Sequence, residues 1–536
     1  MMLGRFDRVL FCFAGAALIA VALAPAVATV FAATPATAGT VGANPPPGAG
    51  EQAVARLPDG LALGVRLGEV ERFAGLSYGV AARWQTPLAA APWDGPRVFG
   101  TLPPRCPQTA AGLAAGTERE DCLYLNVYRP AAVAAQPRAV MVYVHGGGAT
   151  NGSANDHDGS ALAGQGDIIV VTINYRLGAL GFLQGGNYAL QDVLLALRWV
   201  QRSIASLGGD PQRVTLAGES AGGTVICPLL AAPQAKGLFR AAIISSDDCL
   251  HDVDTPAEAR QRATSLQQRL RCDDLACLRL ASAQQLVQAG GGAAPAITEQ
   301  GLIPDYAAAQ IGRRHWLHVP LLLGANRDEG RIAGSGFLHY DEPRYRQWLD
   351  NLLPPAEAEQ VRIAYRGEHA GDPAEYAYKI SAILTDSGMR GFGGCGLLPL
   401  AYAAAQGAPV YFYQFEDSEA PEGGKPGVFH TGAAHAAELA YLWPDGGAFT
   451  RQSARFQPAQ RRLSATMIAD WAAFVRTGKP EVAGQPAWPP LDQQHSYRAF
   501  RPDASVQLSL ADYARQHRCE LWRQLPVIMD RGDARP

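Results

Sequence analysis

Short apolar runs alternate with longer amphipathic stretches along most of the chain. Runs typical of buried strands cover residues 139–144, 168–173, 214–217, 241–244, 320–323 and 410–415. The clearest helix between them spans about 190–207, because its leucines fall on one face and two glycines end it. A second helix is predicted over 459–476. Apolar strands that alternate with helices predict an α/β protein whose mostly parallel sheet is covered by helices on both faces.

Two other patterns complete the predicted domain. Residues 61–78 alternate and contain β-forming side chains, which predicts an antiparallel N-terminal sheet. Stretches at about 250–315 and 335–405 are helix-rich, and we expect them to be insertions over the carboxyl ends of the strands, where open α/β sheets place ligand sites. No linker, repeat or charge run divides the remainder, so residues 51–536 are predicted to form a single domain.

The first fifty residues follow a different pattern. Arg5 and Arg8 precede an almost wholly apolar stretch, and small residues follow it. This order is typical of an export signal peptide, which we assign to residues 1–33, although the apolar stretch is also long enough to remain as a membrane anchor. Residues 34–50 are rich in Ala, Pro and Gly, which predicts a flexible linker. We therefore expect an exported protein, periplasmic or secreted.

Composition narrows the possible partners. Charged residues make up 18% of the chain and the formal net charge is -3, so we expect neither a nucleic-acid partner nor a membrane partner beyond the export signal. Nine cysteines are consistent with an oxidising compartment. Their spacing leaves the connectivity open, with Cys106–Cys122 and Cys272–Cys277 as the simplest local pairs. No cysteine or histidine cluster has zinc spacing, and neither a metal nor a cofactor is expected.

The segment 218–222, with the sequence Gly-Glu-Ser-Ala-Gly, carries the strongest chemical signal. It follows an apolar strand-like run and precedes a helix-like one, which is the context of a nucleophile elbow. The glycines permit a sharp turn that exposes the hydroxyl of Ser220. The hydroxyl then lies at a helix N-terminus, where backbone N–H groups face developing negative charge.

A glycine run, His145-Gly146-Gly147-Gly148, ends the strand-like stretch 139–144. Acyl transfer passes through an oxyanion that needs two or three N–H donors at about 3 Å. Glycine amides are accessible because no Cβ blocks the approach, and the amide of Ala221 supplies a further donor. The ring of His145 is expected to brace the loop.

A serine nucleophile also needs a base and a residue that orients the base. In sites of this kind the acid follows the serine along the chain, and the histidine follows the acid. Glu329 lies just after the predicted strand at 320–323, and its neighbour Asp328 competes with it. Two histidines, His430 and His435, follow the strand at 410–415. The pattern alone leaves both histidines open as the base.

Taken together, these motifs resemble those of the type B carboxylesterases, a family with the α/β-hydrolase fold. The similarity covers nearly everything after about residue 55. It rests on the segments 73–78, 120–127, 172–178, 186–192 and 208–223. Relative to the family, Ala149 replaces a frequent aromatic residue, and no tryptophan lies between Cys106 and Cys122, which argues against a cholinesterase.

The resemblance implies a role for each site residue. It makes Glu329 the triad acid and favours His435 as the base, because Glu438, Leu439 and Tyr441 follow it in the family pattern. The oxyanion donors that it implies are the amides of Gly147, Gly148 and Ala221. The disulfides that it implies are Cys106–Cys122, Cys272–Cys277 and Cys395–Cys519, which leaves Cys227 and Cys249 either paired or as buried thiols.

The sequence therefore predicts an exported serine carboxylic-ester hydrolase that acts on small-molecule esters through an acyl-enzyme. The first alternative is a lipase, which requires an acyl tunnel and a lid that 335–405 could supply. The second is a non-catalytic binding protein on the same fold. The natural ester, the oligomeric state and the signal cleavage site are not encoded in these motifs.

Overall fold

The computed structural model describes residues 52–108, 119–249, 253–290, 294–298, 301–388, 393–421 and 429–525. Contacts divide the chain into two units, residues 1–49 and residues 50–536. The predicted signal peptide (1–33) and linker (34–50) lie outside the described residues.

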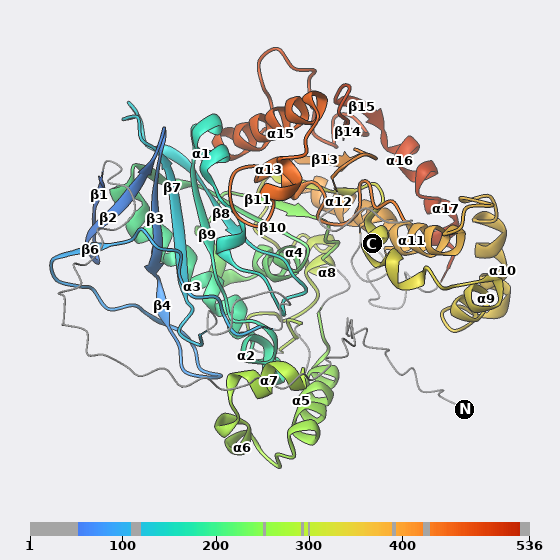
Figure 1. Ribbon diagram of the computed structural model, residues 1–536, viewed down its shortest axis with the longest axis horizontal. Helices are drawn as coiled ribbons and strands as arrows, with labels where there is room; N and C mark the ends of the chain where they lie inside the picture. The colour runs from blue at the N-terminus through green and yellow to red at the C-terminus, as the bar shows by residue number, and fades with distance from the viewer. Residues whose placement is uncertain are drawn as a thin grey trace, which may run out of the picture. The chain divides into compact units, whose positions relative to one another are not determined.

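A large twisted sheet runs through the second unit (Figure 1). In the described residues it has 13 strands in the order β1-β2-β3-β7-β9-β8-β10-β11-β12-β13-β14-β15, with β6 paired to β2, while β4 and β5 form a separate ribbon. The strands are β1 (Gln52–Leu57), β2 (Gly60–Leu67), β3 (Val70–Ser77), β4 (Gly79–Val80), β5 (Leu88–Ala89), β6 (Pro96–Val98), β7 (Tyr124–Pro130), β8 (Arg138–Val144), β9 (Ile169–Ile173), β10 (Gly209–Glu219), β11 (Ala241–Ser245), β12 (Leu321–Asn326), β13 (Val410–Phe415), β14 (Ser496–Phe500) and β15 (Val506–Ser509).

The centre of the sheet is parallel and its ends are antiparallel. Neighbouring strands from β9 to β14 pair in parallel, and β9, β11, β12 and β13 are buried along their whole length. All six strands expected from apolar runs are present, which confirms the mostly parallel sheet. The N-terminal antiparallel strands are continuous with it, because β3 pairs with β7 and β7 pairs with β9. The sequence predicted them as a sheet, but it did not indicate this continuity.

Helices cover both faces of the sheet (Figure 1). Alternate residues of β8 belong to two separate cores: Val140 and Val142 pack with α3 and α4, whereas Met141 and Tyr143 pack with α1, α13 and α15. The helices are α1 (Ser160–Gly166), α2 (Gly178–Phe182), α3 (Tyr188–Ser203), α4 (Ala221–Ile226), α5 (Pro256–Leu270), α6 (Leu275–Leu280), α7 (Ala283–Ala289), α8 (Ala307–Gly312), α9 (Glu342–Asp350), α10 (Pro355–Ala364), α11 (Glu375–Ser387), α12 (Leu397–Ala405), α13 (Leu439–Leu442), α14 (Thr450–Ser453), α15 (Pro458–Thr477), α16 (Leu510–Gln516) and α17 (Cys519–Arg523).

Both helix-rich stretches lie between sheet strands, as their composition indicated. Helices α5 to α8 separate β11 from β12, and helices α9 to α12 separate β12 from β13. Asn187 attaches the first stretch to the start of α3, because its side-chain amide donates to the carbonyl of Ala296 and accepts from the same residue's N–H, both at 2.8 Å.

Four disulfides are present in the described residues: Cys106–Cys122, Cys227–Cys249, Cys272–Cys277 and Cys395–Cys519. Three of them are the pairs that the family resemblance implies. The sequence left open whether Cys227 and Cys249 are joined, and the structure pairs them.

Across the described residues, no helix combines the length and the apolar character needed to cross a lipid bilayer.

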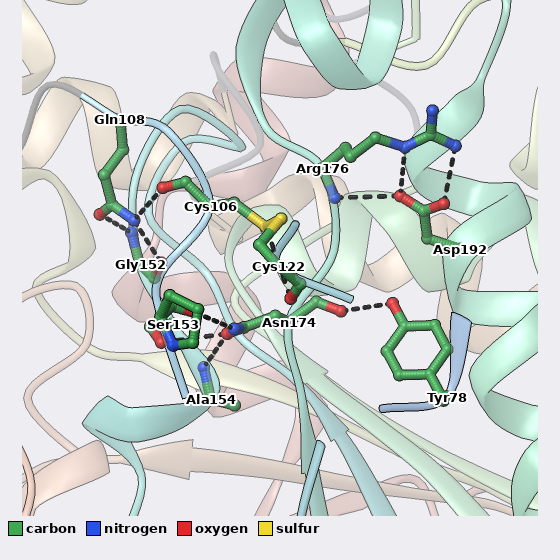
Figure 2. The surroundings of a disulfide bond; sticks show 11 residues. Tyr78, Cys106, Gln108, Cys122, Gly152, Ser153, Ala154, Asn174, Arg176 and Asp192 are labelled. Atoms are coloured by element: carbon green, nitrogen blue, oxygen red, sulfur yellow. Dashed lines mark hydrogen bonds and ion pairs between the residues drawn. A yellow bond between two sulfur atoms is a disulfide. The ribbon is translucent and has the colours of Figure 1, made fainter. Parts of the chain in front are cut away.

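A buried ion pair joins α3 to the segment after β9 (Figure 2). The guanidinium of Arg176 contacts both carboxylate oxygens of Asp192, at 2.7 and 2.8 Å, and the N–H of Arg176 donates to the same carboxylate at 3.0 Å. The side chains are 6% and 0% exposed. A buried charge that loses its partner destabilises the folded state strongly.

We therefore expect Asp192→Asn to lower the free energy of unfolding by about 3–5 kcal/mol, because it leaves the charge of Arg176 buried without a counter-charge. The matched control is Asp210→Asn, whose partner Arg213 is about one-third exposed and 2.8 Å away. This change should cost less than about 1 kcal/mol, because water screens the pair. Urea unfolding followed by circular dichroism measures both, and equal losses would contradict the account.

Candidate active site

Ser220 occupies a sharp turn between β10, which ends at Glu219, and α4, which begins at Ala221. Its φ of 55° and ψ of -130° lie in a region that non-glycine residues rarely adopt. The N–H of Ser220 donates to the carbonyl of Ser245 at 2.9 Å, so the turn is attached to the end of β11. Strained backbone of this kind persists only where its surroundings fix it, and it concentrates at functional sites.

The glycines of this turn are required by close packing. A Cβ on Gly222 would lie 2.1 Å from the carbonyl oxygen of Val144 at the end of β8, and a Cβ on Gly218 would lie 2.7 Å from the backbone of Gly222. A larger residue in place of Gly222 would push the elbow away from β8, and one in place of Gly218 would clash with the other side of the turn. Both glycines of the Gly-x-Ser-x-Gly pattern are therefore required by close backbone contacts in this chain.

Three residues that are distant in sequence meet at this turn. The Nε2 atom of His435 lies 2.8 Å from the hydroxyl oxygen of Ser220, and Nδ1 lies 2.6 Å from the carboxylate of Glu329. Both distances are normal for hydrogen bonds. They correspond to the tautomer in which Nδ1–H donates to Glu329 and Nε2 accepts from the serine hydroxyl. Glu329 follows β12, and His435 comes after β13.

The carboxylate of Glu329 is fully buried and firmly held. One oxygen accepts from the hydroxyl of Ser246 at 2.5 Å and from the N–H of Asn326 at 2.7 Å, and the other contacts His435. Each carboxylate oxygen therefore has a defined partner, which fixes the direction in which Glu329 faces the imidazole ring. Ser246 was not identified from the sequence, because it follows β11 without any local motif.

The two competing residues face elsewhere. The carboxylate of Asp328 pairs with Arg327 at 2.7 Å and with Arg331 at 3.5 Å, rather than with a histidine. The ring of His430 is 47% exposed, and its Nε2 lies 2.7 Å from the carbonyl of Ser418. The geometry therefore groups Glu329 and His435 with Ser220, whereas Asp328 and His430 have other partners.

The glycine run lies directly beside the serine. A Cβ on Gly146 would lie 3.0 Å from the Cβ of Ser220, so only glycine permits this approach. Gly147 and Gly148 both have positive φ, 103° and 61°, which turns the chain away from β8. Ala221 is the first residue of α4, and the N–H groups of a first helical turn have no partner within the helix.

His145 braces this run, as the sequence indicated. Its ring is buried and stacks on Tyr175 with 4.6 Å between centroids, while the Tyr175 hydroxyl donates to the carbonyl of His145 at 2.8 Å. Burial lowers the pKa of His145 to about 4, so the ring is neutral near pH 7. Its role is therefore to hold the backbone in place, since the protonation state does not change near neutral pH.

Two further buried carboxylates surround His435. Glu219 lies 3.3 Å from Nε2, and Glu438 accepts from the side-chain amide of Asn326. Burial lowers the pKa of His435, but the negative charges of Glu329 and Glu219 outweigh this effect and hold the pKa above its usual range. Burial raises the pKa of Glu219, and the charge of Glu329 adds to the rise. The two carboxylates in contact with the ring therefore stabilise positive charge on His435 when it takes up a proton.

One group of potential metal ligands occurs in the described part of the chain. It consists of Cys227, Asp247 and Cys249. The two cysteine sulfurs are joined to each other, so they do not offer thiolates.

Comparison with known proteins places the chain in a family. A family model described as "Carboxylesterase family" matches residues 51–522. Carboxylesterase 3 of Homo sapiens is 33% identical over 474 residues, which cover 78% of this chain and 80% of that protein. Cocaine esterase of Homo sapiens is 30% identical over 484 residues, which cover 82% and 84%. A solved thermophilic PNB esterase matches with a TM-score of 0.72 and 27% identity, covering 87% of this chain and 99% of that one.

The chain belongs to the carboxylesterase family and has the α/β-hydrolase fold. It is a carboxylic-ester hydrolase of type B, and its substrates are small-molecule esters.

The electrostatics of the site can be tested directly. Glu219→Gln removes one of the two carboxylates that contact His435, so the pKa of His435 should fall by about one unit or more. Histidine-selective ¹³C labelling and an NMR pH titration measure this pKa, with a His435→Asn sample to assign the resonance. Glu419→Gln is the control, because it removes an exposed carboxylate beside His430 instead. A His435 titration that Glu219→Gln leaves unchanged contradicts the electrostatic account.

Proposed function

We propose that Ser220, His435 and Glu329 form the catalytic triad of an exported serine esterase. His435 takes the hydroxyl proton of Ser220, and Ser220 attacks the carbonyl carbon of the ester. The imidazolium then protonates the departing alcohol, which leaves an acyl-enzyme. Water attacks the acyl group, with His435 as the base, and releases the acid and the free serine.

The observation that carries this proposal is the continuous hydrogen-bonded chain from Ser220 through His435 to Glu329, at 2.8 and 2.6 Å. Hydrogen-bond reach between nucleophile, base and orienting acid is the geometric signature of an activated serine. The carboxylates of Glu329 and Glu219, at 2.6 and 3.3 Å from the ring nitrogens, support the same roles, because they stabilise the positive charge that the ring carries once it has taken the serine proton.

The proposed oxyanion donors are the amides of Gly147, Gly148 and Ala221. Their support is the contact of the glycine run with Ser220, together with the position of Ala221 at the start of α4. Amides that are already in place cost no reorganisation when the oxyanion forms. The positive φ angles of Gly147 and Gly148 are ones that glycine adopts without steric cost.

Export of the protein is part of the proposal. Disulfides form and persist in oxidising compartments, and four are present in the described residues. The basic and then apolar pattern of residues 1–33 supplies a signal peptide. Expression of the full chain in a Gram-negative host, followed by cell fractionation and N-terminal sequencing, tests this part. Activity that stays in the cytoplasm with an intact N-terminus contradicts it.

Ser220→Ala should lower kcat on a p-nitrophenyl ester by about 10³-fold or more, because the nucleophile is lost while the remaining site is intact. An organophosphate should label the wild-type protein at one site per chain and leave the variant unlabelled. The control is Ser246→Ala, which keeps the nucleophile and should still be labelled. Unchanged turnover in Ser220→Ala would refute the assignment.

Glu329→Gln should lower kcat by about 10³-fold or more, because a neutral amide cannot stabilise the imidazolium form of His435. The matched control is the adjacent Asp328→Asn, whose carboxylate faces two arginines, and it should retain most of its activity. The corresponding histidine pair is His435→Ala, expected to be inactive, and His430→Ala, expected to be active. The opposite order in either pair would contradict the proposed roles.

A further inference from the structure

The side chain of Gln108 is bound to the backbone of Gly152 (Figure 2). Its amide nitrogen donates to the carbonyl of Gly152 at 3.0 Å, and its amide oxygen accepts from the N–H of the same glycine at 3.0 Å. The nitrogen also donates to the carbonyl of Cys106 at 2.9 Å. Gln108 is buried, so these three bonds replace contacts with water. One side chain therefore satisfies both backbone groups of Gly152.

Gly152 closes the loop that begins with the glycine run. Its φ is 106°, and a Cβ there would lie 2.5 Å from both the carbonyl of Gly146 and the ring of His145. Gly152 therefore packs back on the residues that touch Ser220. A shift of Gly152 would move its contacts with Gly146 as well.

The interior of this loop is equally tight. The N–H groups of Thr150 and Asn151 donate to the carbonyl of Gly147, at 3.2 and 3.1 Å. A Cβ on Gly147 would lie 2.4 Å from the carbonyl oxygen of Asn151. Gly147 is therefore in contact with Asn151, the residue that precedes Gly152.

The segment that contains Gln108 is itself attached to the rest of the fold by a disulfide and by a hydrogen bond. The Cys106–Cys122 disulfide joins it to the residues before β7. The side chain of Asn174 accepts from the N–H of Ala154 at 2.9 Å (Figure 2). It also donates to the carbonyl of Pro104 at 3.0 Å, so it attaches the same segment to the residues after the loop.

We propose that Gln108 is a positioning residue for the oxyanion donors and that the Cys106–Cys122 disulfide acts on the site through it. The proposal rests on the proposed function, because it concerns the amides of Gly147 and Gly148. The hydrogen bonds of the Gln108 side chain go to Cys106 and Gly152, not to Ser220. It holds Gly152, and Gly152 sets where the glycine run lies relative to the serine.

The expected effect is specific to the transition state. Loss of one oxyanion donor lowers kcat by about 10²–10³-fold. A change that displaces the loop but keeps its amides should therefore lower kcat by about tenfold. KM should change by less than about twofold, since oxyanion contacts form mainly in the transition state. A trifluoromethyl ketone mimics that state, and its affinity should fall by about the same factor as kcat.

The test compares two glutamine variants of the full chain. Gln108→Met keeps the volume and removes all three hydrogen bonds. Gln201→Met is the matched control, because Gln201 also donates from its amide to two backbone carbonyls, at 2.8 and 3.0 Å, and it does so on α3. The readouts are kcat, KM, the Ki of a trifluoromethyl ketone and the urea unfolding midpoint. Gln108→Glu, which keeps an acceptor for the N–H of Gly152, serves if Gln108→Met does not fold.

We expect Gln108→Met to lower kcat and ketone affinity together, while Gln201→Met changes the unfolding midpoint alone. Removal of the disulfide by Cys106→Ala and Cys122→Ala should lower kcat as well, and adding Gln108→Met should then cost little more, because both act through one contact.

Kinetics of Gln108→Met that match those of the wild type would overturn the proposal, as would equal losses of kcat in both glutamine variants. Organophosphate labelling separates this failure from the failure of the proposed function. A wild type labelled at Ser220, with an unaffected Gln108 variant, overturns the positioning role alone. A wild type that is not labelled at Ser220 overturns both.

Discussion

An imidazole ring held between a serine hydroxyl and a buried carboxylate needs three segments of chain to end at one place. The parallel centre of the sheet provides this arrangement, because the carboxyl ends of β10, β12 and β13 all lie at the same edge of the sheet. Ser220 follows the first strand, Glu329 the second and His435 the third. The order of strands in the sheet, rather than any local motif, therefore brings the three side chains into hydrogen-bond reach.

The same requirement explains features that otherwise look like local irregularities. The strained φ of Ser220 is tolerated because its N–H is bound to the carbonyl of Ser245 and its helix packs closely on β8. The burial of Glu329 is tolerated because Ser246 and Asn326 donate to its carboxylate. The glycine run meets the serine only because no side chain separates them. The strained backbone of Ser220 and the buried charge of Glu329 are therefore each compensated by hydrogen bonds with residues at or next to strand ends.

The sequence predicted the parts of this protein that have local signatures. Apolar runs located the central strands, and the Gly-x-Ser-x-Gly pattern located the elbow, because both reflect short-range constraints. It missed β14, whose five residues include Arg498, because a buried arginine that stacks on Trp488 breaks the apolar pattern. The residue pattern favoured Glu329 but kept Asp328 as a competitor, because spacing does not record the direction of a side chain, and the family resemblance supplied the choice of Glu329.

The sequence also did not identify residues whose contacts join distant parts of the chain. Ser246 meets Glu329 from 83 positions away, and Gln108 meets Gly152 from 44 positions away. Neither residue belongs to a pattern with a fixed period, so neither is visible without three-dimensional contacts. The resemblance to the carboxylesterases supplied the choice of His435 over His430, which residue physics alone left open.

Trapping of the acyl-enzyme tests the central claim most directly. Rapid mixing of the wild-type protein with an excess of a p-nitrophenyl ester, followed by acid quench and peptide mass spectrometry, locates any covalent intermediate. The account predicts a burst of one p-nitrophenol per chain and an acyl group on the peptide that contains Ser220. An acyl group on another residue, or steady turnover without any covalent adduct, would contradict it.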